Sequence, residues 1–92
     1  MPAHYLKTIQ PYFEEVHRGT KTFEFRKNDR NFKGGDEIYL QEYDAENKTY
    51  SGRQVRGIIR YLLQDFPGIS EGYCIFSFSV TQLIISAPQT NK

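Results

Sequence analysis

The sequence predicts a small α+β domain that is mainly β, with about five strands in an open or closed barrel and one helix after the first strand. Apolar and polar residues alternate along several short segments, which is the pattern of half-buried strands. Turn residues separate these segments, and a helix signal occurs once, near the start. The 92 residues, with seven Tyr and seven Phe, suffice for one small core, so we expect a single domain over residues 1–86.

The first strand and the helix are expected before Gly19. Residues 4–7 form a short strand, after which Pro11 suits the first position of a helix, where a missing amide donor has no cost. The helix is predicted to run to about Arg18. Gly19 follows as a left-handed cap, because glycine adopts this backbone conformation without steric penalty.

The second strand is predicted over residues 22–26, where the side chains alternate strictly between two faces. Phe23 and Phe25 share one face, which we expect to pack against the core. Glu24 and Arg26 share the other, with roughly 7 Å between their Cα atoms, so their head groups can meet in a charge-assisted pair. This strand should therefore have one packed and one charged face.

Three further strands follow, separated by turns. A polar loop over residues 27–33 leads to a glycine turn and a strand over residues 37–43. A long strand is expected over residues 53–63, where Gly57 indicates a bulge or tight bend of the kind that closes small barrels. The last main strand covers residues 73–80.

The last strand should direct four side chains into the core: Cys74, Phe76, Phe78 and Val80. Residues 83–85 can add a short extra strand. Residues 87–92 have nothing to bury and are expected to fray.

Positive charge is local in this chain. The net charge is only +1, so the sequence provides no general basic field for duplex binding. Residues 18–33, however, contain six basic and two acidic side chains. Any contact with nucleic acid is therefore expected in this segment, although charged strand edges that prevent aggregation have the same appearance.

Several classes of site are not expected. The single cysteine, Cys74, lies in an apolar strand-like run and has no second thiol to pair with, so a small buried side chain is predicted. His4 and His17 are not at metal-ligand spacing, and we predict neither a metal nor a cofactor. No apolar stretch is long enough to cross a bilayer and no leader pattern precedes residue 5, so a soluble, cytoplasmic protein is expected.

Residues 19–26, GTKTFEFR, resemble the Gly-x-Lys-x-x-Glu-x-Arg signature of the ASCH (activating signal cointegrator homology) domain, which has a PUA-like barrel fold. The similarity extends over about residues 4–79. Four flanking segments occur in the matching order: HYLK before the helix, NDR after the signature, GD before the next strand and GY at the last strand. Together they resemble a short bacterial and phage branch of that superfamily.

This resemblance implies a cleft beside the helix that binds RNA or a nucleotide-like ligand. Lys21, Glu24 and Arg26 are the central residues, where Arg26 supplies a planar fork and Lys21 a point charge. The direction of Lys21 is open, because it directly follows the helix-ending turn. Additional candidates are the loop cations Lys27 and Arg30, His4 at the edge of the first strand, and a tyrosine that stacks on a base, namely Tyr5, Tyr39 or Tyr43.

Two other functions remain as alternatives. Some small ASCH proteins are amidohydrolases that act on N4-acetylcytidine, and Lys21 matches their catalytic lysine. Glu24, however, occupies the position of their threonine, and an adjacent carboxylate favours the charged ammonium, opposite to what a lysine base requires. The third hypothesis is an adaptor or homodimer that uses a tyrosine-rich sheet face for a protein partner. The oligomeric state is not predicted.

Overall fold

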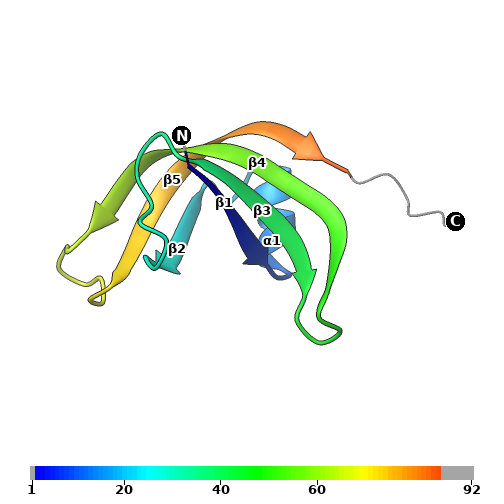
Figure 1. Ribbon diagram of the computed structural model, residues 1–92, viewed down its shortest axis with the longest axis horizontal. Coiled ribbons are helices and arrows are strands. Elements are labelled where there is room, and N and C mark those ends of the chain that lie inside the picture. Colours follow the sequence, from blue (N-terminus) through cyan, green and yellow to red (C-terminus); the bar gives the residue numbers. More distant parts are fainter. Residues whose placement is uncertain (1, 86–92) are drawn as a thin grey trace, which may run out of the picture.

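A single five-stranded sheet forms the frame of the protein, with strand order β1-β3-β4-β5-β2. The computed structural model describes residues 2–85. The strands are β1 (Ala3–Thr8), β2 (Phe23–Lys27), β3 (Glu37–Asp44), β4 (Thr49–Gln64) and β5 (Tyr73–Ile84). β1 pairs with β3 in parallel, and the other three pairings are antiparallel. The sheet is curled into a half-barrel, with the only helix of the described residues, α1 (Tyr12–Arg18), beneath the arch (Figure 1).

The curl of the sheet comes mainly from β4 and β5. The register of this pair shifts at Arg56/Gly57 and again at Ile59/Tyr61. A Cβ added at Gly57 would lie 2.8 Å from the carbonyl oxygen of Ser79, so only glycine permits this close approach of the two strands. The bend predicted at Gly57 is confirmed. Its consequence is that the outer strands, β1 and β2, are brought toward each other across the open side of the sheet.

The short helix α1 ends as the sequence predicts. Arg18 is its last residue, and Gly19 follows with φ 89°, in the left-handed region. The amides of Thr20 and Lys21 both donate to the carbonyl oxygen of Glu15, at 2.9 and 3.0 Å. These bonds fix the turn that delivers the chain to β2. The helix starts at Tyr12, so Pro11 directly precedes it and is not its first residue.

The core lies between α1 and the concave face of the sheet. Its buried apolar residues are Leu6, Phe13, Val16, Phe32, Ile38, Leu40, Val55, Ile59, Cys74, Phe76 and Phe78. Cys74 is fully buried as expected, and burial raises the pKa of its thiol. In the described part of the chain, no helix is long and apolar enough to cross a membrane.

The packing of β2 is the reverse of the sequence prediction. Phe23 and Phe25 are 46% and 57% exposed, whereas Glu24 is only 4% exposed. The charged face therefore points into the half-barrel and the phenylalanine face points out. This inversion is possible because two cations meet the Glu24 carboxylate, which removes the cost of burying it alone.

The last strand also differs from the prediction. β5 is continuous to Ile84, so no separate extra strand exists over residues 83–85. Val80, expected inside, is 44% exposed, because the core ends before the strand does. β4 likewise extends beyond the predicted 53–63 at both ends. The expected fraying of residues 87–92 lies outside the described residues.

Candidate functional site

A cleft of about 600 Å³ opens where the curl brings β1 and β2 toward each other. β1, the segment leading to α1, β2 and the following loop supply most of its wall. Its lining residues are Leu6, Lys7, Thr8, Ile9, Tyr12, Lys21, Phe23, Glu24, Phe25, Arg26, Lys27, Asp29, Arg30, Phe32 and Tyr73. Five of the seven charged side chains in this set are basic, so the lining has a net charge of +3.

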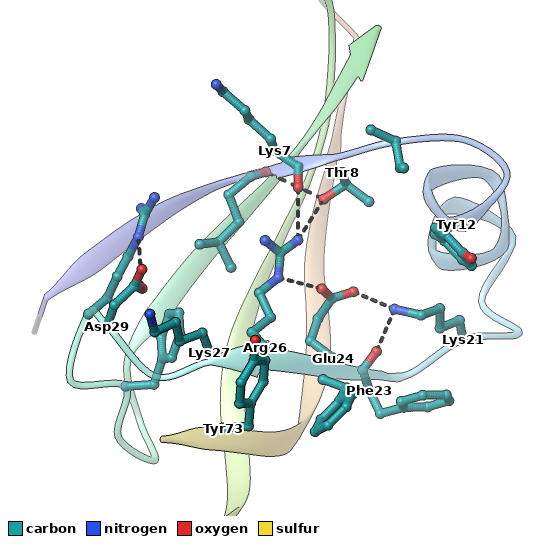
Figure 2. A pocket seen from close by; sticks show the side chains of 15 residues that line it. Lys7, Thr8, Tyr12, Lys21, Phe23, Glu24, Arg26, Lys27, Asp29 and Tyr73 are labelled. Atoms are coloured by element: carbon teal, nitrogen blue, oxygen red, sulfur yellow. Dashed lines mark hydrogen bonds and ion pairs between the residues drawn. The ribbon is translucent and has the colours of Figure 1, made fainter. Parts of the chain in front are cut away.

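Glu24 lies at the centre of the cleft with its carboxylate held by two cations (Figure 2). Its Oε1 accepts a hydrogen bond from Nε of Arg26 at 2.7 Å, and its Oε2 accepts one from Nζ of Lys21 at 2.5 Å. The pairing of Glu24 with Arg26 follows from the pleat, which places them on one face two residues apart. Both oxygens retain a lone pair for a further donor.

Lys21 points into the cleft, which settles the direction that the sequence left open. Besides Glu24, its ammonium donates to the carbonyl oxygen of Phe23 at 2.8 Å and lies 5.1 Å from the centre of the Phe23 ring. The irregular turn after Gly19 makes this possible, because Lys21 has the wrong parity for a regular strand. The structure therefore brings Lys21, Glu24 and Arg26 together.

Two arginines connect the β2 side of the cleft to β1. Nη2 of Arg26 donates to the carbonyl oxygen of Lys7 at 2.9 Å and to Oγ1 of Thr8 at 3.4 Å. Nη1 of Arg30 donates to the carbonyl oxygen of Tyr5 at 2.7 Å. β1 and β2 do not pair with each other, so these side chains bridge the open side of the half-barrel. Within residues 2–85, the hydrogen bonds of Arg26 use Nε and Nη2, so Nη1 keeps its hydrogens for a further acceptor.

Exposed aromatic side chains stand around this charged centre. Tyr12 lies on the α1 side, and Phe23, Phe25 and Tyr73 lie on the β2 side, where the rings of Phe25 and Tyr73 are 5.7 Å apart. None of these four residues was predicted from the sequence to line the site, and Phe23 and Phe25 were expected in the core. The available signal was the strict alternation of Phe23 and Phe25 with Glu24 and Arg26. It indicated two different faces, but the prediction buried the wrong one.

His4 and the tyrosines named as stacking candidates lie outside the cleft. His4 is 8% exposed, with Nε2 2.8 Å from Oδ2 of Asp36, so it neither borders the cleft nor is a solvated terminal residue. The side chain of the next residue, Tyr5, points to the opposite face of β1 and stacks on Tyr39, with ring centres 4.5 Å apart. Tyr43 lies against Tyr50 and beneath the Lys7 ammonium. The structure therefore does not bring His4 or Tyr43 to the Glu24 centre.

Tyr43 belongs to a second hollow, of about 570 Å³, beside the turn between β3 and β4. Glu42 is its most connected residue, and it accepts hydrogen bonds from Arg53, Ser51 and Gln10 at 2.6 to 3.2 Å. The bond from Arg53, followed by those from Ser51 and Gln10, lowers the pKa of Glu42 from 4.5 to about 2, although burial opposes the shift. No group of three metal-ligating side chains occurs here or elsewhere in residues 2–85.

The lowered pKa of Glu42 predicts a loss of stability in acid. A carboxylate with a lower pKa in the folded state stabilises the fold above its unfolded pKa, and the stabilisation disappears as the pH falls through the folded value. We therefore expect the free energy of unfolding to decrease between pH 4.5 and about pH 2. Urea unfolding across this range should show a flatter pH profile for Glu42→Gln than for the parent. Glu46→Gln, at an exposed turn residue, should leave the profile unchanged; equal profiles for all three proteins would contradict the prediction.

Comparison with known proteins places the chain in a family. Residues 3–78 match the family described as a domain of unknown function (DUF3850). The chain is also 39% identical, over 56 residues, to an uncharacterised 12.9 kDa protein in the GpA 3′ region of Escherichia phage P2. That match covers 61% of this chain and 50% of the phage protein, so the chain aligns with about half the length of its relative. The match over residues 3–78 shows that the chain belongs to the DUF3850 family.

Proposed function

We propose that this protein is an RNA- or nucleotide-binding module of the ASCH type, with a PUA-like fold, and that its ligand binds in the cleft between β1 and β2. The observation that carries the proposal is the Glu24 carboxylate, buried between Lys21 and Arg26 at the centre of a cleft with basic and aromatic walls. The curled five-stranded sheet with one helix after the first strand is also the arrangement that the ASCH resemblance implies.

Stability alone is a weak reason for this charged centre. A buried ion pair is often no more stabilising than apolar residues of the same volume, because removing the charges from water is costly. Here the charges face a cleft, where a ligand can use them. Buried ionisable groups that converge in a cleft are typical of functional sites.

The chemistry of the cleft suits a nucleotide. Nη1 of Arg26 supplies a free donor, and the Glu24 oxygens supply acceptors beside it, which together match the edge of a base. Lys27 and Arg30 line the same cleft, where their positive charges can bind phosphate groups. The exposed rings of Phe23 and Tyr12 offer surfaces on which bases stack, as in other proteins that bind single-stranded nucleic acid.

Salt dependence tests the binding. If the ligand is single-stranded RNA and about three phosphates are contacted, the logarithm of affinity should fall with the logarithm of salt concentration with a slope of about −2. Fluorescence anisotropy with a labelled RNA oligonucleotide, repeated with single-stranded DNA and a free nucleotide, measures this slope and separates the ligand classes. Absence of binding to all three, or an affinity that salt does not change, would refute the proposal.

Two lysines, Lys27 at the end of β2 and Lys33 in the loop that follows, provide a matched test of the site. Lys27 lines the cleft and Lys33 does not, and both lysines are exposed. Lys27→Ala should weaken RNA binding by about threefold to tenfold and reduce the salt slope by about 1, as the loss of one phosphate contact does. Lys33→Ala should leave both unchanged. Equal effects of the two substitutions would mean that the RNA does not bind in this cleft.

The two alternative functions have less support. A lysine base would have to give up the hydrogen bonds from Lys21 to Glu24 and to the Phe23 carbonyl oxygen, and release of acetate from N4-acetylcytidine is the assay for that activity. An adaptor with a tyrosine-rich face would need one continuous aromatic patch. The aromatic contacts at the surface are instead between separate pairs, Tyr5–Tyr39, Phe25–Tyr73 and Tyr43–Tyr50, and Tyr39 and Tyr43 are half-buried.

A further inference from the structure

The second half of β5 has an open edge. β2 pairs with β5 from Tyr73 to Ser77, and the last backbone bond on that side runs from the amide of Phe78 to the carbonyl oxygen of Thr22. β4 continues along the other side as far as Ile84. In the chain described by the structure, residues 79–84 are therefore paired on one side only. Figure 1 shows this end of β5, in orange, extending beside β4.

This open segment lacks the usual protection of a sheet edge. Its sequence, SVTQLI, contains no charge, proline or glycine, and residues 72–91 include no Asp, Glu, Lys or Arg, although a quarter of the chain is charged. Val80 and Leu83 are exposed, at 44% and 48%. Exposed edges of this kind pair with another strand unless charges, proline or a covering element prevent it.

We propose that residues 79–84 of β5 pair antiparallel with the same segment of a second copy, which joins two five-stranded sheets into one. A symmetric dimer has a self-complementary interface, so a residue near the two-fold axis faces its own counterpart. Any charged residue there would repel itself, whereas an uncharged, β-branched segment pairs without penalty. The absence of charge over this stretch therefore fits a second copy better than a partner recognised by charge.

The dimer and the nucleotide cleft are independent. None of residues 79–84 lines the cleft, and the bridging arginines lie on β2 and the loop after it. Pairing through β5 would leave both clefts of a dimer accessible. The inference therefore does not rest on the proposed function, and the failure of either proposal leaves the other intact.

Sedimentation equilibrium of the full chain tests the dimer. The expected mass at micromolar concentrations is twice the 10.8 kDa of one chain. Gln82→Lys places like charges on both copies near the two-fold axis and should raise the dissociation constant roughly tenfold or more. Ser77→Lys is the matched control, because this exposed residue lies in the same strand where both edges are paired. It should leave the dissociation constant unchanged.

Hydrogen exchange of the parent protein provides a second readout that needs no variant. The backbone amides of residues 79–84 that face the open edge should exchange more slowly at high protein concentration than at low concentration, while the amides of β1 should not change. A monomer at every concentration, a dimer that Gln82→Lys and Ser77→Lys affect equally, or concentration-independent exchange in this segment would each overturn the inference.

Discussion

Glu24→Ala should lower the free energy of unfolding by about 3 kcal/mol, the largest stability effect expected for any charged residue of the cleft. The Glu24 side chain is 5% exposed and accepts one hydrogen bond from each of two cations. Removing one partner of a buried charge network leaves the others uncompensated, which typically costs about 3 to 5 kcal/mol. We expect the lower end of that range, because the side chains of Lys21 and Arg26 are 19% and 24% exposed and can regain some water from the cleft. Urea unfolding at neutral pH measures the effect.

Glu15→Ala is the matched control for this substitution. Glu15 also pairs with an arginine, Arg18, but both side chains are exposed, at 40% and 60%. Such a surface pair contributes about 0 to 1 kcal/mol, so Glu15→Ala should change stability little. If the two substitutions had equal effects, the Glu24 carboxylate would not be the buried centre of the cleft.

Local signals in the sequence predicted most of the fold. Gly19 marked the end of the helix because its backbone adopts a left-handed conformation, and Gly57 marked the bend because a side chain there would collide with Ser79. Ile38 and Leu40 alternate with polar neighbours and are fully buried, as their pattern indicates. The two glycines and the alternation are visible in short stretches of sequence, although the residue that Gly57 approaches, Ser79, lies in another strand.

The orientation of β2 could not be predicted in this way. Alternation shows that a strand has two different faces, but the choice of the buried face depends on what surrounds it. A rule based on hydrophobicity assigns Phe23 and Phe25 to the core. In the folded protein the core is already filled from the other strands and α1, and Lys21 and Arg26 neutralise Glu24 on the inner face. The deciding contact of Lys21 depends on the turn after Gly19, whose direction has no pattern in the sequence.

Part of the geometry of the candidate site was also predicted from the sequence, and the rest was missed for a related reason. The pleat of one strand explains why Glu24 and Arg26 meet, and this pairing was expected from their spacing. The contacts of Arg26 and Arg30 with β1 connect residues at least eighteen positions apart. They exist because the sheet curls until its outer strands face each other, which is a property of the whole domain. His4 was misplaced because nothing in its local sequence indicates that Asp36 lies beside it.

Arg26→Ala should weaken RNA binding by about tenfold to a hundredfold, the largest expected effect on the proposed function. One arginine that contacts a phosphate or a base edge typically contributes about 1 to 3 kcal/mol. Arg26 also fixes the shape of the cleft, because the same guanidinium bonds to Glu24, the Lys7 carbonyl oxygen and Thr8. The substitution therefore removes a ligand contact and a bridge between β2 and β1 together.

The salt dependence of binding separates these two roles of Arg26. If Nη1 contacts a phosphate, Arg26→Ala should reduce the magnitude of the salt slope by about 1, whereas a purely structural role would lower affinity without changing the slope. Arg26→Lys retains the charge but has no planar fork to reach Glu24 and β1 at once, so it should restore the slope more fully than the affinity. Arg60→Ala is the control, because Arg60 contacts Ser79 outside the cleft and its loss should change neither quantity. Equal binding by the parent and Arg26→Ala would exclude this cleft as the nucleotide site, because the guanidinium lies beside the Glu24 carboxylate at its centre.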